Sequence, residues 1–337
     1  MIETLVEEYR GNVLENTHSG RICGVNERGE VVYSIGDVEQ LTYLRSSAKP
    51  LQALPSIQRG VQEKYNLTDI ELALLGASHR GEPFHIEALE SLSRKVGLNE
   101  DNLICLPTYP LNPDARDRLF KSDHPKRKIY HNCSGKHFGI MSLCKLLAVE
   151  IDNYWEREHA AQQEILKTVS IMSGYPADHI SLGVDGCGVP VFALPLRNIA
   201  QAYMTLACPD LIENVALGKA VQTLTRIMNE QSRMIGGTDQ ICSTLLQDPN
   251  IVAKGGAKGI YCFGLKNERL GFALKVSDGS EEEWPLIVAG ILQQIDYSNQ
   301  STINNMLRLS SQKVINDNNR IVGENKISFH LSAYRRD

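Results

Sequence analysis

Residues 259–276 read GIYCFGLKNERLGFALKV, and this stretch decides the fold class. Two strand-like runs, Gly259–Leu265 and Arg269–Val276, flank the polar triplet Lys266-Asn267-Glu268. This pattern predicts a β-hairpin, because a short polar turn joins two neighbouring antiparallel strands. A hairpin near the C-terminal end does not suit a doubly wound parallel sheet.

The N-terminal region also predicts strands, at Leu5–Tyr9, Arg21–Val25 and Val31–Ser34, with a turn at 26–29. Apolar residues at spacings of three and four then predict helices. These helices are Ile86–Val96, Phe138–Val149, Glu156–Met172, Leu211–Asn229 and Trp284–Ile295. We therefore expect an α+β fold, in which an antiparallel sheet from both chain ends is flanked by helices and interrupted by a helical insertion at roughly 80–230. The polar tail from Ser310 to Asp337 predicts a final strand and a frayed end.

Length and composition are those of a globular protein, with 337 residues, 42% hydrophobic and 22% charged. Because no repeat or linker divides the sequence, we expect a single catalytic unit over residues 1–337. The net charge of −5 disfavours nucleic acid or anionic lipid as the main partner. The acidic N-terminus is unlike a signal peptide, and no apolar run approaches the ~20 residues of a membrane helix. These features predict a cytoplasmic protein without a membrane partner.

Residues 45–50, Arg-Ser-Ser-Ala-Lys-Pro, predict the start of a helix, since proline is tolerated in the first turn. Ser46 and Lys49 are three residues apart and would share a helix face. A neutral lysine can accept the serine proton if burial or a nearby cation such as Arg45 lowers its pKa. Taken alone, the tetrapeptide is more typical of a helix cap than of a nucleophile.

A second serine, Ser78, lies in the polar turn Gly76–Pro83 after a buried apolar run. In the same turn Glu82 could cap the following helix. Downstream, Lys254-Gly255-Gly256 leads into the hairpin. A Ser-x-x-Lys at a helix start and a Lys-x-Gly on a strand are two of the three signature motifs of serine β-lactamases and penicillin-binding proteins. The third motif, Ser-Asp-Asn, is not obvious in this sequence.

The eight cysteines are spread too widely for a disulfide scaffold, and most should be reduced and buried. Cys133 would open an apolar helix, and Cys187 occupies the glycine-rich turn Asp185–Pro190. Two cysteines near histidine and lysine could bind zinc. Their spacing matches no standard zinc finger, however, and on its own favours two buried thiols. His137 could be a third ligand or a substrate contact.

Taken together, five motifs resemble the rhizobial-type (class 3) L-asparaginase family, also called asparaginase II. The motifs are Arg45-Ser46-Ser47-Ala48-Lys49-Pro50, Gly76-Ala77-Ser78-His79-x-Gly81-Glu82-Pro83, His131-Asn132-Cys133-Ser134-Gly135-Lys136-His137, Asp185-Gly186-Cys187-Gly188-Val189-Pro190 and Lys254-x-Gly256-Ala257. The resemblance runs from roughly residue 10 to residue 325. It implies a fold similar to serine β-lactamases and glutaminases, a homodimer, and hydrolysis of L-asparagine to L-aspartate and ammonia.

The resemblance also implies two Ser–Lys pairs in one site, Ser46 with Lys49 and Ser78 with Lys254, with Ser46 as the nucleophile. Which of Ser46, Ser47 and Ser78 attacks is not decided by the sequence. The same resemblance implies a nearby zinc ion, bound by Cys133, Lys136, Cys187 and a water molecule. This zinc would support substrate binding rather than carry out the chemistry.

A free amino acid needs a cation for its carboxylate and an anion for its ammonium group. Arg45 and His137 are candidates for the cation, and Asp185 and Glu82 for the anion. Asp185 could instead support the metal. Two residues depart from the family pattern. Lys258 stands where a glutamate is usual, and Arg80 stands where a small polar residue is expected.

Two alternatives remain open from the sequence. One is another amidohydrolase of the same architecture, a glutaminase or a D-peptidase. The other is a non-catalytic protein that binds an amino acid or a metal, which the presence of both Ser–Lys pairs disfavours. Turnover of asparagine, glutamine and a D-Ala-D-Ala peptide would distinguish these possibilities.

Overall fold

The computed structural model describes residues 3–310 and 312–333, and the chain divides into two compact units. The first unit comprises Met1–Ser47, Leu194–Ala207 and Asp239–Asp337, and the second comprises Ala48–Ala193 and Cys208–Thr238. The two chain ends therefore belong to one unit, and most of the expected helical insertion belongs to the other. The single catalytic unit expected over residues 1–337 stays a prediction.

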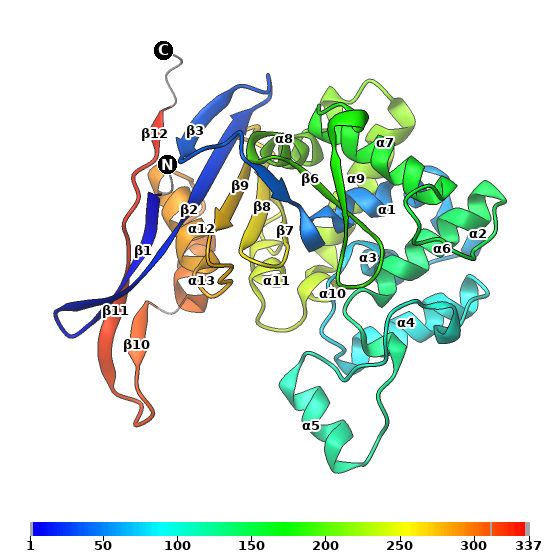
Figure 1. Cartoon of the computed structure of the whole chain (residues 1–337), viewed down its shortest axis with the longest axis horizontal. Coiled ribbons are helices and arrows are strands. Elements are labelled where there is room, and N and C mark those ends of the chain that lie inside the picture. The colour runs from blue at the N-terminus through cyan, green and yellow to red at the C-terminus, as the bar shows by residue number, and fades with distance from the viewer. Residues whose placement is uncertain (1–2, 311, 334–337) are drawn as a thin grey trace. The chain divides into compact units, whose positions relative to one another are not determined.

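An antiparallel sheet forms the first unit, as the sequence predicts. Its strands follow the order β10-β11-β1-β2-β9-β8-β7, so the N-terminal β1 and β2 lie between two groups of strands from the C-terminal part of the chain (Figure 1). β3 pairs with β2 and with β12 beside this path. The bounds are β1 (Glu3–Arg10), β2 (Val13–Asn26), β3 (Val31–Ile35), β7 (Ile251–Gly255), β8 (Ile260–Leu265), β9 (Leu270–Val276), β10 (Lys313–Ile315), β11 (Ile321–Ile327) and β12 (Ser332–Ala333).

The hairpin predicted at residues 259–276 is confirmed as β8 and β9, which pair antiparallel up to Leu265 opposite Leu270. A helix that the sequence analysis missed, α8 (Leu196–Ala207), packs on this hairpin. Two glycines permit the close approach. A Cβ on Gly264 would lie 2.2 Å from the Tyr203 carbonyl oxygen, and one on Gly271 would lie 2.3 Å from that of Ala200. The strands thus carry glycine where the helix backbone touches them.

Three further helices of the first unit follow in the described C-terminal part of the chain. The predicted helix at Trp284–Ile295 is confirmed as α12 (Trp284–Gln294), which packs against β11. α11 (Ile241–Leu245) and α13 (Gln300–Leu309) lie beside each other, and the sequence analysis did not predict them. The described part of the tail from Ser310, where the sequence predicts one final strand, contains three strands, β10, β11 and β12. Residues 334–337 of the predicted frayed end lie outside the described residues.

The second unit is mainly helical. Four of its helices confirm the sequence predictions: α4 (Pro83–Lys95), α6 (Ser134–Leu147), α7 (Ala160–Ser173) and α9 (Val215–Glu230). The others are α1 (Lys49–Gln58), α2 (Val61–Tyr65), α3 (Asp69–Ala73), α5 (Pro113–Lys121) and α10 (Ser232–Gly236). A short hairpin of β5 (Ser181–Val184) and β6 (Pro190–Pro195) carries the turn that contains Cys187.

Helix α1 is the centre of the second unit and packs against α6, α7 and α9. Its residues from Lys49 to Ser56 are all buried, and the buried Ser56 hydroxyl donates a hydrogen bond to the Gly139 carbonyl oxygen of α6. A 3₁₀ turn over Arg45–Ala48 leads into it, and Pro50 lies in its first helical turn as expected. Within residues 3–310 and 312–333, none of the helices is both long and apolar enough to span a bilayer.

Candidate active site

Lys49 is the first residue of α1 and is only 1% exposed. Its Nζ donates hydrogen bonds to Ser78 Oγ at 2.9 Å and to the Asn132 carbonyl oxygen at 3.0 Å. A neutral lysine amine has two N–H donors and one lone pair, so these two acceptors would leave the lone pair available for a proton. A buried amine held against a serine hydroxyl is the arrangement that a lysine base requires.

Three contacts fix the position of Ser78. The preceding segment turns back on itself through a bond from Ala77 N–H to the Leu74 carbonyl oxygen, and Ser78 N–H donates to the Ile235 carbonyl oxygen at 2.9 Å. Helix α6 passes directly against this turn at Gly135, where a Cβ would lie 2.3 Å from the Leu74 oxygen. The serine is half-buried, so its hydroxyl is held by a rigid backbone yet is not sealed off.

His79, the residue after Ser78, is fully buried and serves a structural network. Gly81 N–H donates to its Nδ1 at 3.2 Å, which assigns the ring proton to Nε2, and Nε2 lies 2.8 Å from Ser134 Oγ. Ser134 in turn donates to the Ile129 carbonyl oxygen. Burial, with smaller effects from nearby positive charge, lowers the pKa of His79 well below its usual value. The ring is therefore neutral and ties the Ser78 turn to the start of α6.

Cys133, Lys136 and Cys187 lie together, and their role as zinc ligands stays a prediction. All three are buried, and Lys136 Nζ donates to Cys187 Sγ at 2.8 Å. Cys133 and Cys187 are hydrogen-bonded through their side chains. Cys133 N–H also donates to His131 Nδ1, which fixes the backbone at the entry to α6. Two thiols and an amine thus converge from α6 and from the β5–β6 turn.

The charges of this cluster are coupled. The hydrogen bond from Cys187 lowers the pKa of Cys133 well below its usual value against the effect of burial, and the same bond raises the pKa of Cys187. Burial opposes the charged form of Lys136, but the negative charge at Cys133 and Cys187 raises its pKa above the usual value. Negative charge at Cys133 and positive charge at Lys136 therefore favour each other in this cluster.

The two thiols of this cluster suit zinc, because zinc binds soft thiolate ligands well. Among the residues that the structure describes, no three His, Cys, Asp or Glu side chains are placed to hold a metal ion. A metal here would therefore depend on Lys136 as its third donor from the protein. The lysine would have to lose its proton first, since an ammonium group has no lone pair to donate.

His137 follows Lys136 and is fully buried in the second unit. Its Nδ1 lies 2.7 Å from the Tyr154 hydroxyl, which itself accepts a hydrogen bond from Ile104 N–H. Its Nε2 has no hydrogen-bond partner among the described residues. Burial, with Lys136 as the next contribution, lowers the pKa of His137 well below its usual value. A neutral ring with one open nitrogen can contact a ligand but supplies no positive charge.

The two acidic candidates differ in how they are bonded. Both carboxylate oxygens of Glu82 accept hydrogen bonds, from the Thr238 backbone and hydroxyl and from Asn112 Nδ2. Glu82 is therefore occupied in joining three loop segments at the start of α4. Asp185 begins the turn that carries Cys187, and its Oδ2 accepts a long contact of 3.6 Å from Cys187 Sγ. Its side chain is half-buried next to the thiol cluster.

Ser46 and Ser47 lie in the first unit and have different surroundings. Ser47 is fully buried, and its Oγ donates to the Leu44 carbonyl oxygen at 2.6 Å. Its own carbonyl accepts a bond from the Tyr203 hydroxyl. Ser47 is thus a structural residue of the turn. Ser46 is half-buried, as is Arg45, whose φ of 50° is in the left-handed region.

The Lys254-x-Gly256 motif packs against this same turn. A Cβ on Gly256 would lie 2.8 Å from the Leu44 oxygen and 2.2 Å from Ile260 Cγ2, so a side chain does not fit there. Lys254 lies on β7, is 2% exposed, and donates to the Gly255 carbonyl oxygen at 2.7 Å. The first unit therefore brings together the Ser46 turn and the Lys254 strand, which are about two hundred residues apart in the chain.

The structure also adds residues that the sequence analysis did not single out. The Asn132 carbonyl and Ser134 lie inside the quoted motif 131–137, but their roles depend on partners from other motifs. Tyr154 and Tyr203 lie in no motif, and no sequence signal identified them. The pairing of Lys49 with Ser78 was likewise not predicted, because the resemblance pairs Lys49 with Ser46.

Comparisons with known proteins add the following. The family model described as L-asparaginase II matches residues 6–327. No curated protein sequence matches the chain. Among solved structures, a β-lactamase from Mycobacterium bovis is 14% identical, over 82% of this chain and 94% of that one, with a TM-score of 0.42. A class C β-lactamase from Rhodobacter sphaeroides is also 14% identical, over 86% and 93% of the two chains, with a TM-score of 0.38.

Proposed function

The chain belongs to the L-asparaginase II family and is an amidohydrolase, and on that premise we propose that it hydrolyses L-asparagine to L-aspartate and ammonia through a serine–lysine acyl-enzyme. The observation that carries this proposal is the 2.9 Å hydrogen bond from Lys49 Nζ to Ser78 Oγ inside the second unit. A lysine buried to this degree is costly unless it is used or fully paired. Here it is bonded to a serine hydroxyl and to one carbonyl oxygen.

In the first half of the reaction, Ser46 Oγ attacks the side-chain amide carbon. Ser46 is the better candidate of the adjacent serines, because the Ser47 hydroxyl is buried and bonded to the Leu44 carbonyl oxygen. Lys49, three residues further along, accepts the Ser46 proton. The bond between carbon and nitrogen breaks, and Ser78 passes a proton from Lys49 to the departing ammonia.

In the second half, water attacks the ester carbon of the acyl-enzyme. Lys254 is the proposed base for this water, since it is a buried amine on β7, next to the turn that carries Ser46. The ester bond breaks, Ser46 regains a proton, and L-aspartate is released. Arg45 is the proposed cation for the substrate carboxylate. Asp185 and Glu82 are the two proposed candidates for the ammonium group.

Zinc is part of the proposal as a supporting ion held by Cys133, Lys136 and Cys187. When bound, it would supply a Lewis-acidic position that can take a carboxylate oxygen of the substrate. Lys136 and the two thiols would coordinate it in their deprotonated forms. The proton transfers above involve only the serines, the lysines and water. The homodimer and the cytoplasmic location also remain predictions.

The test is release of ammonia from L-asparagine, measured beside L-glutamine and a D-Ala-D-Ala peptide. We expect asparagine to be the preferred substrate, and Ser46→Ala to lower kcat by about 10³-fold or more. Ser122→Ala, an exposed serine at the end of α5, is a matched control that should leave the rate unchanged. Near-normal activity of a folded Ser46→Ala variant would overturn the nucleophile assignment. Preference for either other substrate would overturn the asparaginase assignment.

A further inference from the structure

The first unit contains a cavity of about 460 Å³ in which positive side chains gather. Its lining comes from β2, from β9 and the residue that follows it, from the segment before α1, and from the turn between β7 and β8. The four cationic side chains in the lining are Arg21, Arg45, Lys258 and Lys275. Among the described residues that line this cavity there is no carboxylate. A cavity of this size accommodates a small ligand.

Arg21 and Lys275 face each other directly across the β2–β9 pair, where they are register partners. Like charges in directly opposite positions of neighbouring strands destabilise a sheet. Two cations are therefore held at a position where an anion between them would remove the repulsion. The negative charges that act on them are Asp37 for Arg21 and Asp278 for Lys275, and neither lines the cavity.

Arg21 is an unusual residue in its own right. It is 5% exposed, and its Nε has no hydrogen-bond partner among the described residues. Burial lowers its pKa. Burial and then the charge of Arg21 also lower the pKa of Lys275, which is half-buried. A buried guanidinium group is normally paired with acceptors, so this one points to a ligand oxygen.

Lys258 is placed over the cavity by a strained turn. Its φ is 61°, in the left-handed region that disfavours residues other than glycine, asparagine and aspartate. The next residue, Gly259, packs so closely that a Cβ would lie 2.4 Å from the Val276 carbonyl oxygen. The turn is thereby fixed against the end of β9. Backbone strain of this kind persists where contacts with the surrounding structure hold the residue in place, and such positions are often found at binding sites.

From this geometry we infer that the cavity lined by Arg21, Lys258 and Lys275 binds a small dianion through carboxylate or phosphate oxygens. Two or more fixed cations match a ligand with two negative charges, and guanidinium and ammonium groups are the usual partners of such oxygens. The inference shares Arg45 with the proposed amide hydrolysis but does not require that reaction, because Arg21, Lys258 and Lys275 have no role in it.

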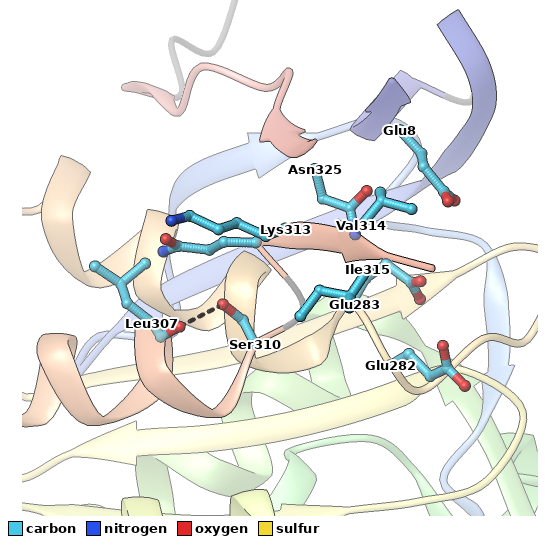
Figure 2. Close-up of a pocket in the computed structure, with 10 residues that line it drawn as sticks. Glu8, Glu282, Glu283, Leu307, Ser310, Lys313, Val314, Ile315 and Asn325 are labelled. Atoms are coloured by element: carbon cyan, nitrogen blue, oxygen red, sulfur yellow. Dashed lines mark hydrogen bonds between the residues drawn. The ribbon is translucent and has the colours of Figure 1, made fainter. Parts of the chain in front are cut away.

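A second cavity of the same unit provides the contrast. It measures about 620 Å³ and is lined by Glu8, Glu282 and Glu283, with Lys313 beside them (Figure 2). Three carboxylates in its lining would repel a dianion. Lys313 therefore offers a matched control, since it is an exposed lysine that lines a cavity in the same unit.

The test is isothermal titration calorimetry of the full chain with inorganic phosphate and, separately, with malonate at low ionic strength. Two variants remove a charge from the site: Lys258→Asn, which also suits the left-handed backbone, and Lys275→Met. The control is Lys313→Met. We expect at least one of the two anions to bind the wild type, and each site variant to weaken that binding by about tenfold or more.

Binding of phosphate alone would identify a phosphate ligand, and binding of malonate alone a dicarboxylate. The inference is overturned if neither anion binds at millimolar concentration, or if Lys258→Asn and the control bind as tightly as the wild type. Lys258 is exposed, so its variant should fold even if Lys275→Met does not. Ammonia release measured on the same samples separates the two hypotheses, since the calorimetry reports the anion whether or not asparagine is hydrolysed.

Discussion

The side chain of Lys49 joins two motifs that are 29 residues apart, because its Nζ lies 2.9 Å from Ser78 Oγ. Lys49 opens the central helix of the second unit, and Ser78 lies in the polar turn that precedes α4. The Asn132 carbonyl oxygen, from a third motif, accepts the other hydrogen bond of the lysine. Three of the five sequence motifs thus meet at one amine, which is why this amine is the best candidate for the base.

Replacing Lys49 with methionine should lower kcat for asparagine by about 10²–10⁴-fold, because the proton acceptor is lost while the buried stem is retained. The measurement is ammonia release together with circular dichroism to confirm folding. Lys145→Met is the matched control. That lysine donates to the Val96 and Gly97 carbonyl oxygens in the same unit, so its loss should affect stability but not the rate. Equal rates for wild type and Lys49→Met would exclude Lys49 as the base.

The adjacent serines allow a paired experiment. Ser46→Ala should abolish most activity with little change in stability, since Ser46 is half-buried. Ser47→Ala should retain activity but lower the free energy of unfolding by about 1 kcal/mol, because it removes the buried bond to the Leu44 oxygen. Kinetics and denaturant unfolding of both variants check this. If Ser47→Ala is the inactive variant of the two, the roles of the two serines are reversed.

Gly135→Ala tests how the Ser78 turn is supported. Alanine favours a helix by up to about 1 kcal/mol over glycine, but the new Cβ would lie 2.3 Å from the Leu74 oxygen. The clash should prevail, with a net loss of about 1–3 kcal/mol in the free energy of unfolding and a lower kcat. Gly186→Ala is the control, since a Cβ there meets no atom within 4 Å. Equal unfolding midpoints for the two variants would show that α6 can move away.

The order of strands and helices was predictable from the sequence because it depends on local periodicity. The hairpin at 259–276 was predicted from its two strand-like runs and polar turn, and helices such as α9 from apolar residues at spacings of three and four. α8 was not predicted although it is amphipathic. The need for glycine at Gly264 and Gly271 could not be predicted either, because it arises only from the close packing of α8 on these positions. Contacts between segments that are far apart in the chain cannot be read from the periodicity of either segment alone.

The candidate site was predictable as a set of residues but not as a set of partners. Each motif identified its serine, lysine or cysteine from local context and resemblance. The bond between Lys49 and Ser78, and the occupation of Glu82 by Thr238, depend on where loops meet in three dimensions. The cation pair of Arg21 and Lys275 was missed for the same reason, since the two residues are 254 positions apart and become neighbours only through the β2–β9 register.

Acid should destabilise the second unit through His85. Burial lowers its pKa from 6.5 to about 4, so between these values the unfolded state binds a proton that the folded state does not. The contribution of neutral His85 to the free energy of unfolding is therefore complete above about pH 6.5. It is lost as the pH falls toward 4, by about 3 kcal/mol in total. His85→Gln should flatten this part of the stability curve. The exposed His124→Gln should leave it unchanged, and identical curves for all three proteins would contradict the prediction.

Zinc binding should require the lysine of the thiol cluster as well as the thiols. Cys187→Ser and Lys136→Met should each lower zinc affinity by about tenfold or more, whereas Cys144→Ser, a buried thiol further along α6, should not. Affinity should rise with pH, because Lys136 has a raised pKa and must release its proton to the solvent before it can coordinate. Equilibrium dialysis against a chelating buffer at two pH values measures both effects. If Lys136→Met binds zinc like the wild type, the two thiols hold the metal without the amine, and the pH dependence should then come from the thiols alone.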